Sequence, residues 1–340
     1  MKKPLITIGE SIHASIQKTG EIMKQLAEIG HGAYSMPSEP LKYIKSLIKS
    51  QVNEGADYIA VNLDAFGEDD PQIAIDMMQE YVKLIRKWSG GVPVCIDSSD
   101  DDVLIAGLKE WYNTSRDRGQ KTEDRRQRTE DRPRSSVIHS PLINSVKVYT
   151  MENILPLKKD FNFAFIALLV GEDKPMGPSG SYSVDELYSL AEQIFDVAVG
   201  KCNFKPQEIF FDSTVFPLAI DMPMEPGVPG YTYRTFETIK KIKNNSKMEG
   251  AHCVLGVSNC VRDLPGRKIG VCRAFVAKAM EYGLDAAIVN VAHHYGSVEP
   301  APELLELIDA YAKMDGSTER VNSAMQLMTK FCQESRKPAK

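Results

Sequence analysis

The 340-residue sequence lacks a long hydrophobic run, an excess of positive charge and closely spaced cysteine pairs. No apolar stretch approaches the roughly 20 residues that a membrane-spanning helix needs. The formal net charge of −5 argues against a nucleic-acid partner, because binding to phosphates depends on excess Lys and Arg. The six cysteines include no CxxC pair and lie mostly in apolar runs, which is typical of reduced core residues.

A targeting segment and a metal site are also not expected. The N-terminal MKKPLITIGESIHASI has a short apolar stretch, broken by Glu10 and His13, which is too little for a signal peptide. We therefore expect a cytoplasmic protein. The pair His293-His294 invites a metal interpretation, but a barrel metallohydrolase needs further ligands, and ESIHAS supplies a single histidine. We expect no metal to be bound by this chain.

Strand-like and helix-like patterns alternate eight times. The apolar runs cover 5–10, 58–64, 92–97, 141–146, 163–170, 208–214, 252–258 and 285–290. Segments with helical spacing cover 40–54, 71–88, 101–112, 150–159, 184–200, 231–245, 270–282 and 302–314. Most of the runs are continuously apolar, as strands buried on both faces should be. Eight β/α units with short links predict an α/β fold, a closed (β/α)8 TIM barrel, rather than an open doubly wound sheet.

The predicted organisation is a single barrel domain over 1–315 with a C-terminal helical tail over 316–340. The first βα segment is long, and its stretch 11–39 contains a possible helix at 20–29. The segment 115–136 contains the near-repeats QKTEDRR and QRTEDRP and no large apolar residue. Such a composition cannot offset its ordering entropy by burial, so we expect a charged insertion that is disordered or forms a loose helix.

A small polar residue closes several of the apolar runs. A buried strand has no use for an unpaired carboxylate or amide, because desolvating one costs about 2–7 kcal/mol. In a (β/α)8 barrel the strand ends and the following loops form the active site. The sequence therefore places a candidate site at this rim, and the polar residues that close the runs are Asp97, Asn144, Asp212, Asn259 and Asn290.

Ordered motifs connect the chain to a known family. They are GADYIAVNLD at the second strand, VCIDSS at the third, LINS at the fourth, FFDSTVFP at the sixth, and GVSNCVRDLPGRKIGVCRAFVAKAMEYGLDAAIVN across the last two. As an ordered set they resemble the pterin-binding barrel of methyltetrahydrofolate:corrinoid methyltransferases, and more distantly dihydropteroate synthase. The synthase would be expected to show Ser-Arg-Lys where this chain has Ser258-Asn259-Cys260.

The resemblance implies a methyltransferase that moves a methyl group between a corrinoid protein and N5 of tetrahydrofolate. Tetrahydrofolate or 5-methyltetrahydrofolate would be the substrate, and cobalamin would arrive on the partner protein. We expect a homodimer. Two alternatives remain open: a dihydropteroate synthase-like condensing enzyme, and a non-catalytic pterin-binding subunit of a corrinoid methyltransferase complex.

The chemistry of a pterin suggests which residues bind it. The pyrimidine edge presents an amino group and a ring N–H side by side, and a carboxylate accepts both. Asp212 is the candidate for this contact. The family positions imply that Asp97 and Asn144 meet the remaining polar groups, and Asn62 is a further candidate contact. A carboxylate that instead caps the following helix is the structural alternative for any one of them.

The last motif supplies the candidate catalytic residue. N5 is a poor leaving group unless it is hydrogen-bonded or protonated as its bond to the methyl group breaks, and Asn259 matches the family residue that donates this hydrogen bond. Ser258 belongs to the same motif as a binding residue. Arg267 and Arg273 are candidates for binding the folate tail or the corrinoid protein, and pairing of one of them with a helix carboxylate is the alternative.

The sequence departs from the family pattern at the first two strands. It has Ser11-Ile12-His13 where the family often has Arg-Ile-Asn, and Ala60 where an Asp is expected. His13 is a candidate replacement for the missing Asn as a hydrogen-bond partner, and an ordinary loop histidine is the alternative.

Overall fold

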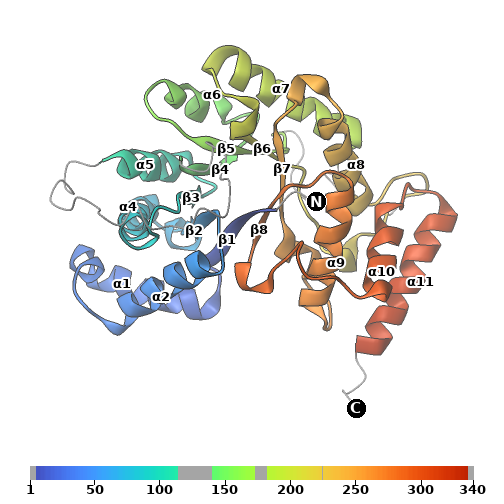
Figure 1. Cartoon of the computed structure of the whole chain (residues 1–340), viewed down its shortest axis with the longest axis horizontal. Helices are drawn as coiled ribbons and strands as arrows, with labels where there is room; N and C mark the ends of the chain where they lie inside the picture. The colour runs from blue at the N-terminus through green and yellow to red at the C-terminus, as the bar shows by residue number, and fades with distance from the viewer. Residues whose placement is uncertain (1–4, 114–139, 173–181, 224, 336–340) are drawn as a thin grey trace.

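Eight parallel strands form a closed barrel in sequence order (Figure 1). The computed structural model describes residues 5–113, 140–172, 182–223 and 225–335. The strands are β1 (Ile6–His13), β2 (Tyr58–Asn62), β3 (Val94–Asp97), β4 (Leu142–Val146), β5 (Ala164–Leu168), β6 (Ile209–Asp212), β7 (His252–Gly256) and β8 (Ala286–Val289). Strand β8 pairs with β1 and closes the ring. The predicted (β/α)8 fold is confirmed, and every strand overlaps its predicted range.

Helices surround the barrel. The longer ones are α1 (Gln17–Ile29), α2 (Glu39–Asn53), α4 (Pro71–Trp88), α5 (Asp101–Tyr112), α7 (Val184–Cys202), α8 (Tyr231–Lys243), α9 (Lys268–Glu281), α10 (Pro302–Ala312) and α11 (Thr318–Ser335). Local signals fix several of their starts: Ser183 and Glu186 form a reciprocal capping box at α7, and Pro71 and Pro302 stand in the first turns of α4 and α10.

The helix predicted at 150–159 is mostly not α-helical. One turn, α6 (Met151–Ile154), is followed by the 3₁₀ helix η5 (Leu155–Lys159). Pro156 lacks a backbone N–H and its ring clashes with the preceding turn, so the α-helical hydrogen bonds of α6 do not continue. The short α3 (Asp64–Gly67) after β2 was not predicted.

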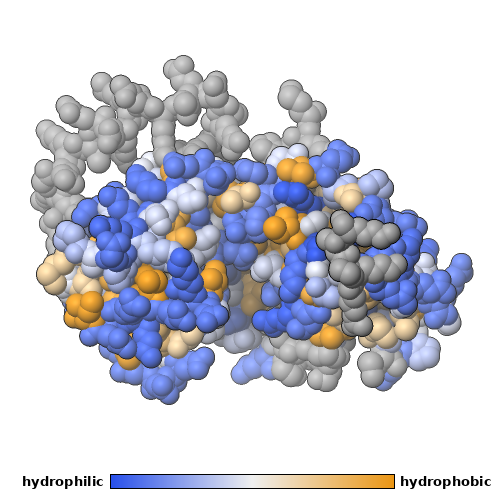
Figure 2. Space-filling view, turned by 90° about the horizontal axis from the view of Figure 1, so that it is seen from below, coloured by the Kyte–Doolittle hydropathy of each residue, from blue (hydrophilic) through white to orange (hydrophobic). Residues whose placement is uncertain are grey.

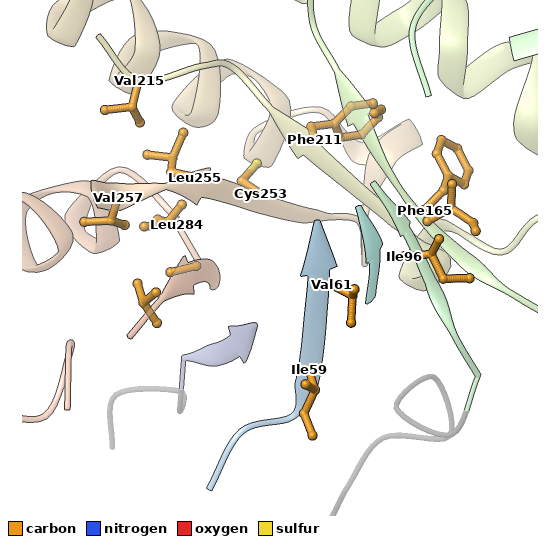
Figure 3. Close-up of a cluster of buried hydrophobic side chains, with 14 of the residues drawn as sticks. Ile59, Val61, Ile96, Phe165, Phe211, Val215, Cys253, Leu255, Val257 and Leu284 are labelled. Carbon is orange, nitrogen blue, oxygen red and sulfur yellow. The ribbon is translucent and has the colours of Figure 1, made fainter. Parts of the chain in front are cut away.

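Two apolar layers line the two faces of the barrel wall. Inside, a plug of side chains includes Tyr58, Phe210 and Val254, with the rings of Tyr58 and Phe210 edge to face at 6.4 Å. Outside, a larger core fills the space between strands and helices. Figure 3 shows part of this outer core, with labelled residues of β2, β3, β5, β6 and β7. Burial on both faces explains why the strands are continuously apolar in sequence.

The two-residue period of the strands positions the polar strand ends above the interior plug. Ala60 and Cys95 belong to the plug, so Asn62 and Asp97, two residues further along each strand, face the same interior. Pairing register places Asn62 beside Asp97 and Asp97 beside Asn144. Asp212 pairs with Leu168 on the other side. The carboxyl-terminal end of the barrel interior is therefore polar.

The remaining parts lie around this barrel. Helix α11 contacts α10 and buries Ala324 and Phe331. The charged insertion predicted at 115–136 falls within 114–139, outside the described residues. None of the described helices combines the length and apolar character needed to cross a membrane. The face seen in Figure 2 is mainly hydrophilic, with separate hydrophobic groups among the polar residues.

Candidate active site

The carboxyl-terminal ends of the strands surround a cavity of about 730 Å³. Its position is the one at which (β/α)8 enzymes place their active sites. Six of the predicted site residues line it, and they come from β2, β3, β4, β6 and the turn after β7: Asn62, Asp97, Asn144, Asp212, Ser258 and Asn259.

Asn62, Asp97 and Asn144 form a row of hydrogen-bonded side chains across three neighbouring strands. The amide nitrogen of Asn144 donates to Oδ1 of Asp97 at 2.9 Å, and the side chain of Asn62 also hydrogen-bonds to Asp97. Burial raises the pKa of Asp97 to about 7, with the nearby Asp64 as the next cause, and the hydrogen bond from Asn62 opposes the shift. Near neutral pH this carboxyl group is therefore partly protonated.

Asp212 is fixed by the turn that follows β6. Its Oδ1 accepts a hydrogen bond from the backbone N–H of Thr214 at 2.7 Å, and Thr214 has a positive φ of 66°. Its other oxygen has no hydrogen-bond partner among the described residues. Burial raises the pKa of Asp212 to about 7. One oxygen is thus held by the backbone, and the other is available to a ligand.

Two further carboxylates line the cavity, and neither was among the site residues predicted from the sequence. Glu10 of β1 accepts a hydrogen bond from the Ser258 hydroxyl at 3.3 Å, and burial raises its pKa to about 7. Asp64 begins α3 and accepts from the hydroxyl of Ser98 at 2.6 Å and from the N–H of Ser99 at 2.9 Å. Both carboxylates close predicted strand runs, so the rule that selected Asp97 could also have found them.

Ser258 and Asn259 lie on the 3₁₀ helix η10 (Val257–Val261), directly after β7. Both side chains are exposed at the edge of the cavity. The amide nitrogen of Asn259 lies 3.7 Å from the position that a Cβ on Gly256 would take, so the amide stands close to the end of β7. Within the described part of the chain, this amide makes no hydrogen bond and is free to donate one to a ligand.

Three other candidates lie outside the lining of the cavity. Arg267 pairs with Glu303 of α10, and Arg273 donates to the backbone carbonyl of His293 at 3.1 Å. A role for these arginines in binding the folate tail or a corrinoid protein stays a prediction. Asn290 accepts a hydrogen bond from the N–H of Ala292 at 3.2 Å and so caps the turn η11 (Val291–His293). The last strand-end residue therefore caps a turn instead of lining the cavity.

The histidines do not gather into a metal site in the described regions. His13 lines the cavity, its Nδ1 accepts from the N–H of Ser15 at 3.1 Å, and burial lowers its pKa. His293 hydrogen-bonds to the hydroxyl of Tyr295 at 2.7 Å. No group of three or more metal-binding side chains occurs among the residues that the structure describes. His13 is thus a neutral polar group in the cavity wall at neutral pH.

The cavity combines hydrogen-bond acceptors with a free amide donor. Three carboxyl groups with pKa values near 7 accept hydrogen bonds when ionised and donate when protonated. Such values are typical of functional sites, because a group that titrates near the working pH can both take and give a proton. The arrangement suits a polar ligand that carries N–H groups and at least one acceptor.

No protein-family model matches this chain. Among solved structures, the dihydropteroate synthase of Coxiella burnetii in complex with pteroic acid is 11% identical with a TM-score of 0.48, covering 98% of this chain and 94% of that chain. The synthase of Stenotrophomonas maltophilia with active site-bound imidazole is 13% identical with a TM-score of 0.45, covering 88% and 90%. The synthase of Thermus thermophilus is 14% identical with a TM-score of 0.44, covering 76% and 86%.

Proposed function

We propose that this protein is an enzyme that binds a reduced pterin and transfers a methyl group between N5 of tetrahydrofolate and a corrinoid carried by a partner protein. The observation that carries the proposal is the placement of Asp97, Asn144, Asp212 and Asn259 around one cavity at the carboxyl-terminal end of the barrel. The motifs that hold these residues are those that resemble the methyltransferases.

The polar groups match the pterin edge by number and type. Asp212 offers an oxygen that no described residue uses, and its ionised carboxylate would accept the amino group and the ring N–H. Asp97 and Asn144, joined at 2.9 Å, would meet the polar atoms on the other side of the ring. Because these side chains hold one another in place before a ligand arrives, little entropy would be lost on binding.

Asn259 would act on the departing nitrogen. When the bond between N5 and the methyl carbon breaks, its electron pair stays on N5, which becomes more basic and finally takes a proton from a protonated carboxyl group of the cavity or from water. The free amide of Asn259 would donate a hydrogen bond to this nitrogen, and the bond would strengthen as the electron density grows. A docked corrinoid would supply the nucleophile that receives the methyl group.

Charge in the cavity disfavours the condensing alternative. A dihydropteroate synthase-like enzyme would need cations for the leaving pyrophosphate. The described lining instead has five carboxylates and one lysine: Glu10, Asp64, Asp97, Glu172, Asp212 and Lys147. This balance favours a substrate whose reacting end carries hydrogen-bond donors rather than phosphates.

Asn259→Ala tests the proposal. Tetrahydrofolate binding, measured by calorimetry, should change little, whereas turnover should fall about 10²- to 10³-fold because the lost hydrogen bond forms chiefly in the transition state. Methyl transfer is followed by the absorbance change between cob(I)alamin and methylcobalamin. A matched control is Asn290→Ala, which removes the same amide from a strand end outside the cavity and should keep near-normal turnover.

Two results would contradict the proposal. If the unsubstituted protein binds tetrahydrofolate but transfers no methyl group, it is a pterin-binding subunit rather than an enzyme. If Asn259→Ala transfers methyl groups at the unsubstituted rate with saturating folate, the amide has no part in the reaction.

A further inference from the structure

The described lining of the cavity contains a single basic side chain. Lys147 follows β4 directly and is the one lysine or arginine in the described lining, which also contains five carboxylates. A lysine in such a setting would be expected to pair with a carboxylate, because an ammonium ion gains most from a charged partner. Among the described residues, it forms no such ion pair.

The described contact of the Lys147 ammonium is with an aromatic ring. Its Nζ lies 5.7 Å from the ring centre of Tyr149, which is 45% exposed and lines the same cavity. An exposed cation–π contact is weak, and weaker than the interaction that a hydrogen-bonded carboxylate would supply. The ammonium can therefore exchange this contact for an anionic ligand group at little cost.

The backbone holds Lys147 in the cavity lining. The hydroxyl of Thr150 accepts the N–H of Lys147 at 3.1 Å, and the carbonyl of Lys147 accepts the N–H groups of Thr150 at 3.0 Å and Met151 at 2.9 Å. Lys147 stands three residues beyond Asn144, so their Cα atoms are at most about 10 Å apart at the rise of an extended chain. A ligand bound to Asn144 can thus extend over Tyr149 to this ammonium.

We propose that Lys147 and Tyr149 form a subsite for the acidic tail of the folate, the aromatic ring contacting the p-aminobenzoyl group and the ammonium binding a tail carboxylate. The inference rests on the proposed function and makes Lys147 a determinant of substrate specificity: the enzyme prefers pterins with a carboxylate-bearing tail. It also assigns to Lys147 the role that the sequence suggested for Arg267 and Arg273, which pair elsewhere.

Calorimetry with two ligands tests the subsite in the full-length protein. The ligands are tetrahydrofolate and 6-methyltetrahydropterin, which has the same bicycle without the tail. Lys147→Met should weaken tetrahydrofolate binding about tenfold and leave 6-methyltetrahydropterin binding within about twofold. Lys147→Arg should restore most of the lost affinity, and raising the salt concentration should shrink the difference between the two ligands.

Lys159→Met is the matched control, because Lys159 is an exposed lysine of the same β4–β5 connection and lies outside the cavity. It makes the same charge change and should leave both affinities unaltered. If Lys147→Met lost the same affinity for both ligands, or lost affinity for neither, the tail subsite would be overturned and the proposed function would still stand. Failure of the unsubstituted protein to bind either ligand would overturn both.

Discussion

At the scale of single residues, protonation decides what the cavity can bind. Glu10, Asp97 and Asp212 all have pKa values raised to about 7 by burial. A protonated carboxyl group donates one hydrogen bond, whereas a carboxylate accepts at both oxygens. Binding of a ligand edge that carries two N–H groups therefore requires the ionised form and selects it.

Asp212→Ala should weaken tetrahydrofolate binding by about 1–3 kcal/mol, because two N–H groups of the ligand would lose their acceptor. In the unsubstituted protein the affinity should fall as the pH drops below about 7, since protonation removes the acceptor. Asp212→Asn keeps the shape and should remove this residue's part of the pH dependence. Calorimetry across pH measures both effects, and unchanged affinity in a folded Asp212→Ala protein would reject the assignment.

At the scale of elements, close packing between helices and strands sets how precisely the strand ends are placed. A Cβ added to Gly107 of α5 would lie 2.9 Å from Cγ2 of Ile96 on β3 and 2.9 Å from Cγ of Met78 on α4. Ile96 directly precedes Asp97. The missing side chain at Gly107 thus lets α5 approach the strand that carries a site carboxylate.

Gly107→Ala should lower the free energy of unfolding by about 1–3 kcal/mol, because overpacking forces neighbouring side chains to move. The control is Gly200→Ala in α7, where nothing lies within 4 Å of an added Cβ. That change should raise the stability by up to about 1 kcal/mol, since alanine favours the helix over glycine. Urea unfolding measures both variants; equal effects would show that packing at Gly107 is not limiting.

At the scale of the whole molecule, the barrel gathers acidic groups at one end. Asp64, Glu10 and Asp212 each raise the pKa of Asp97 further through charge repulsion. These residues come from four strands or strand ends spread over the sequence, so the repulsion exists only in the folded state. Folding therefore favours the protonated forms of these acids.

The buried acids of the cavity should make the ligand-free protein less stable as the pH rises from about 4 to about 7. In this window the folded state holds protons that the unfolded chain, with ordinary acid pKa values, has released, so the free energy of unfolding falls with pH. Glu10→Gln and Asp97→Asn should each make the free energy of unfolding fall less over this pH range. Urea unfolding at several pH values measures it, and an identical pH slope in both variants and the unsubstituted protein would refute the explanation.

The sequence by itself determined where the strands lie and at which end of the barrel the candidate site lies. Continuous apolar runs with helical segments between them predict a barrel, because strands buried on both faces need no polar alternation. A carboxylate or amide at the end of such a run must reach the rim, and Asp97, Asn144 and Asp212 do line the cavity there. A continuous apolar run is a local property of the sequence, so it can be identified without knowing the fold.

Only the tertiary structure decided which polar groups meet. The polar residues that close strand runs look alike in sequence, yet Asn290 caps a turn while Asn259 is free at the cavity edge. Arg267 and Arg273 stand in the motif with Asn259, but their partners, Glu303 and the carbonyl of His293, lie on later parts of the chain. Lys147 shares the cavity because barrel closure brings strands together, and no local pattern records such long-range contacts.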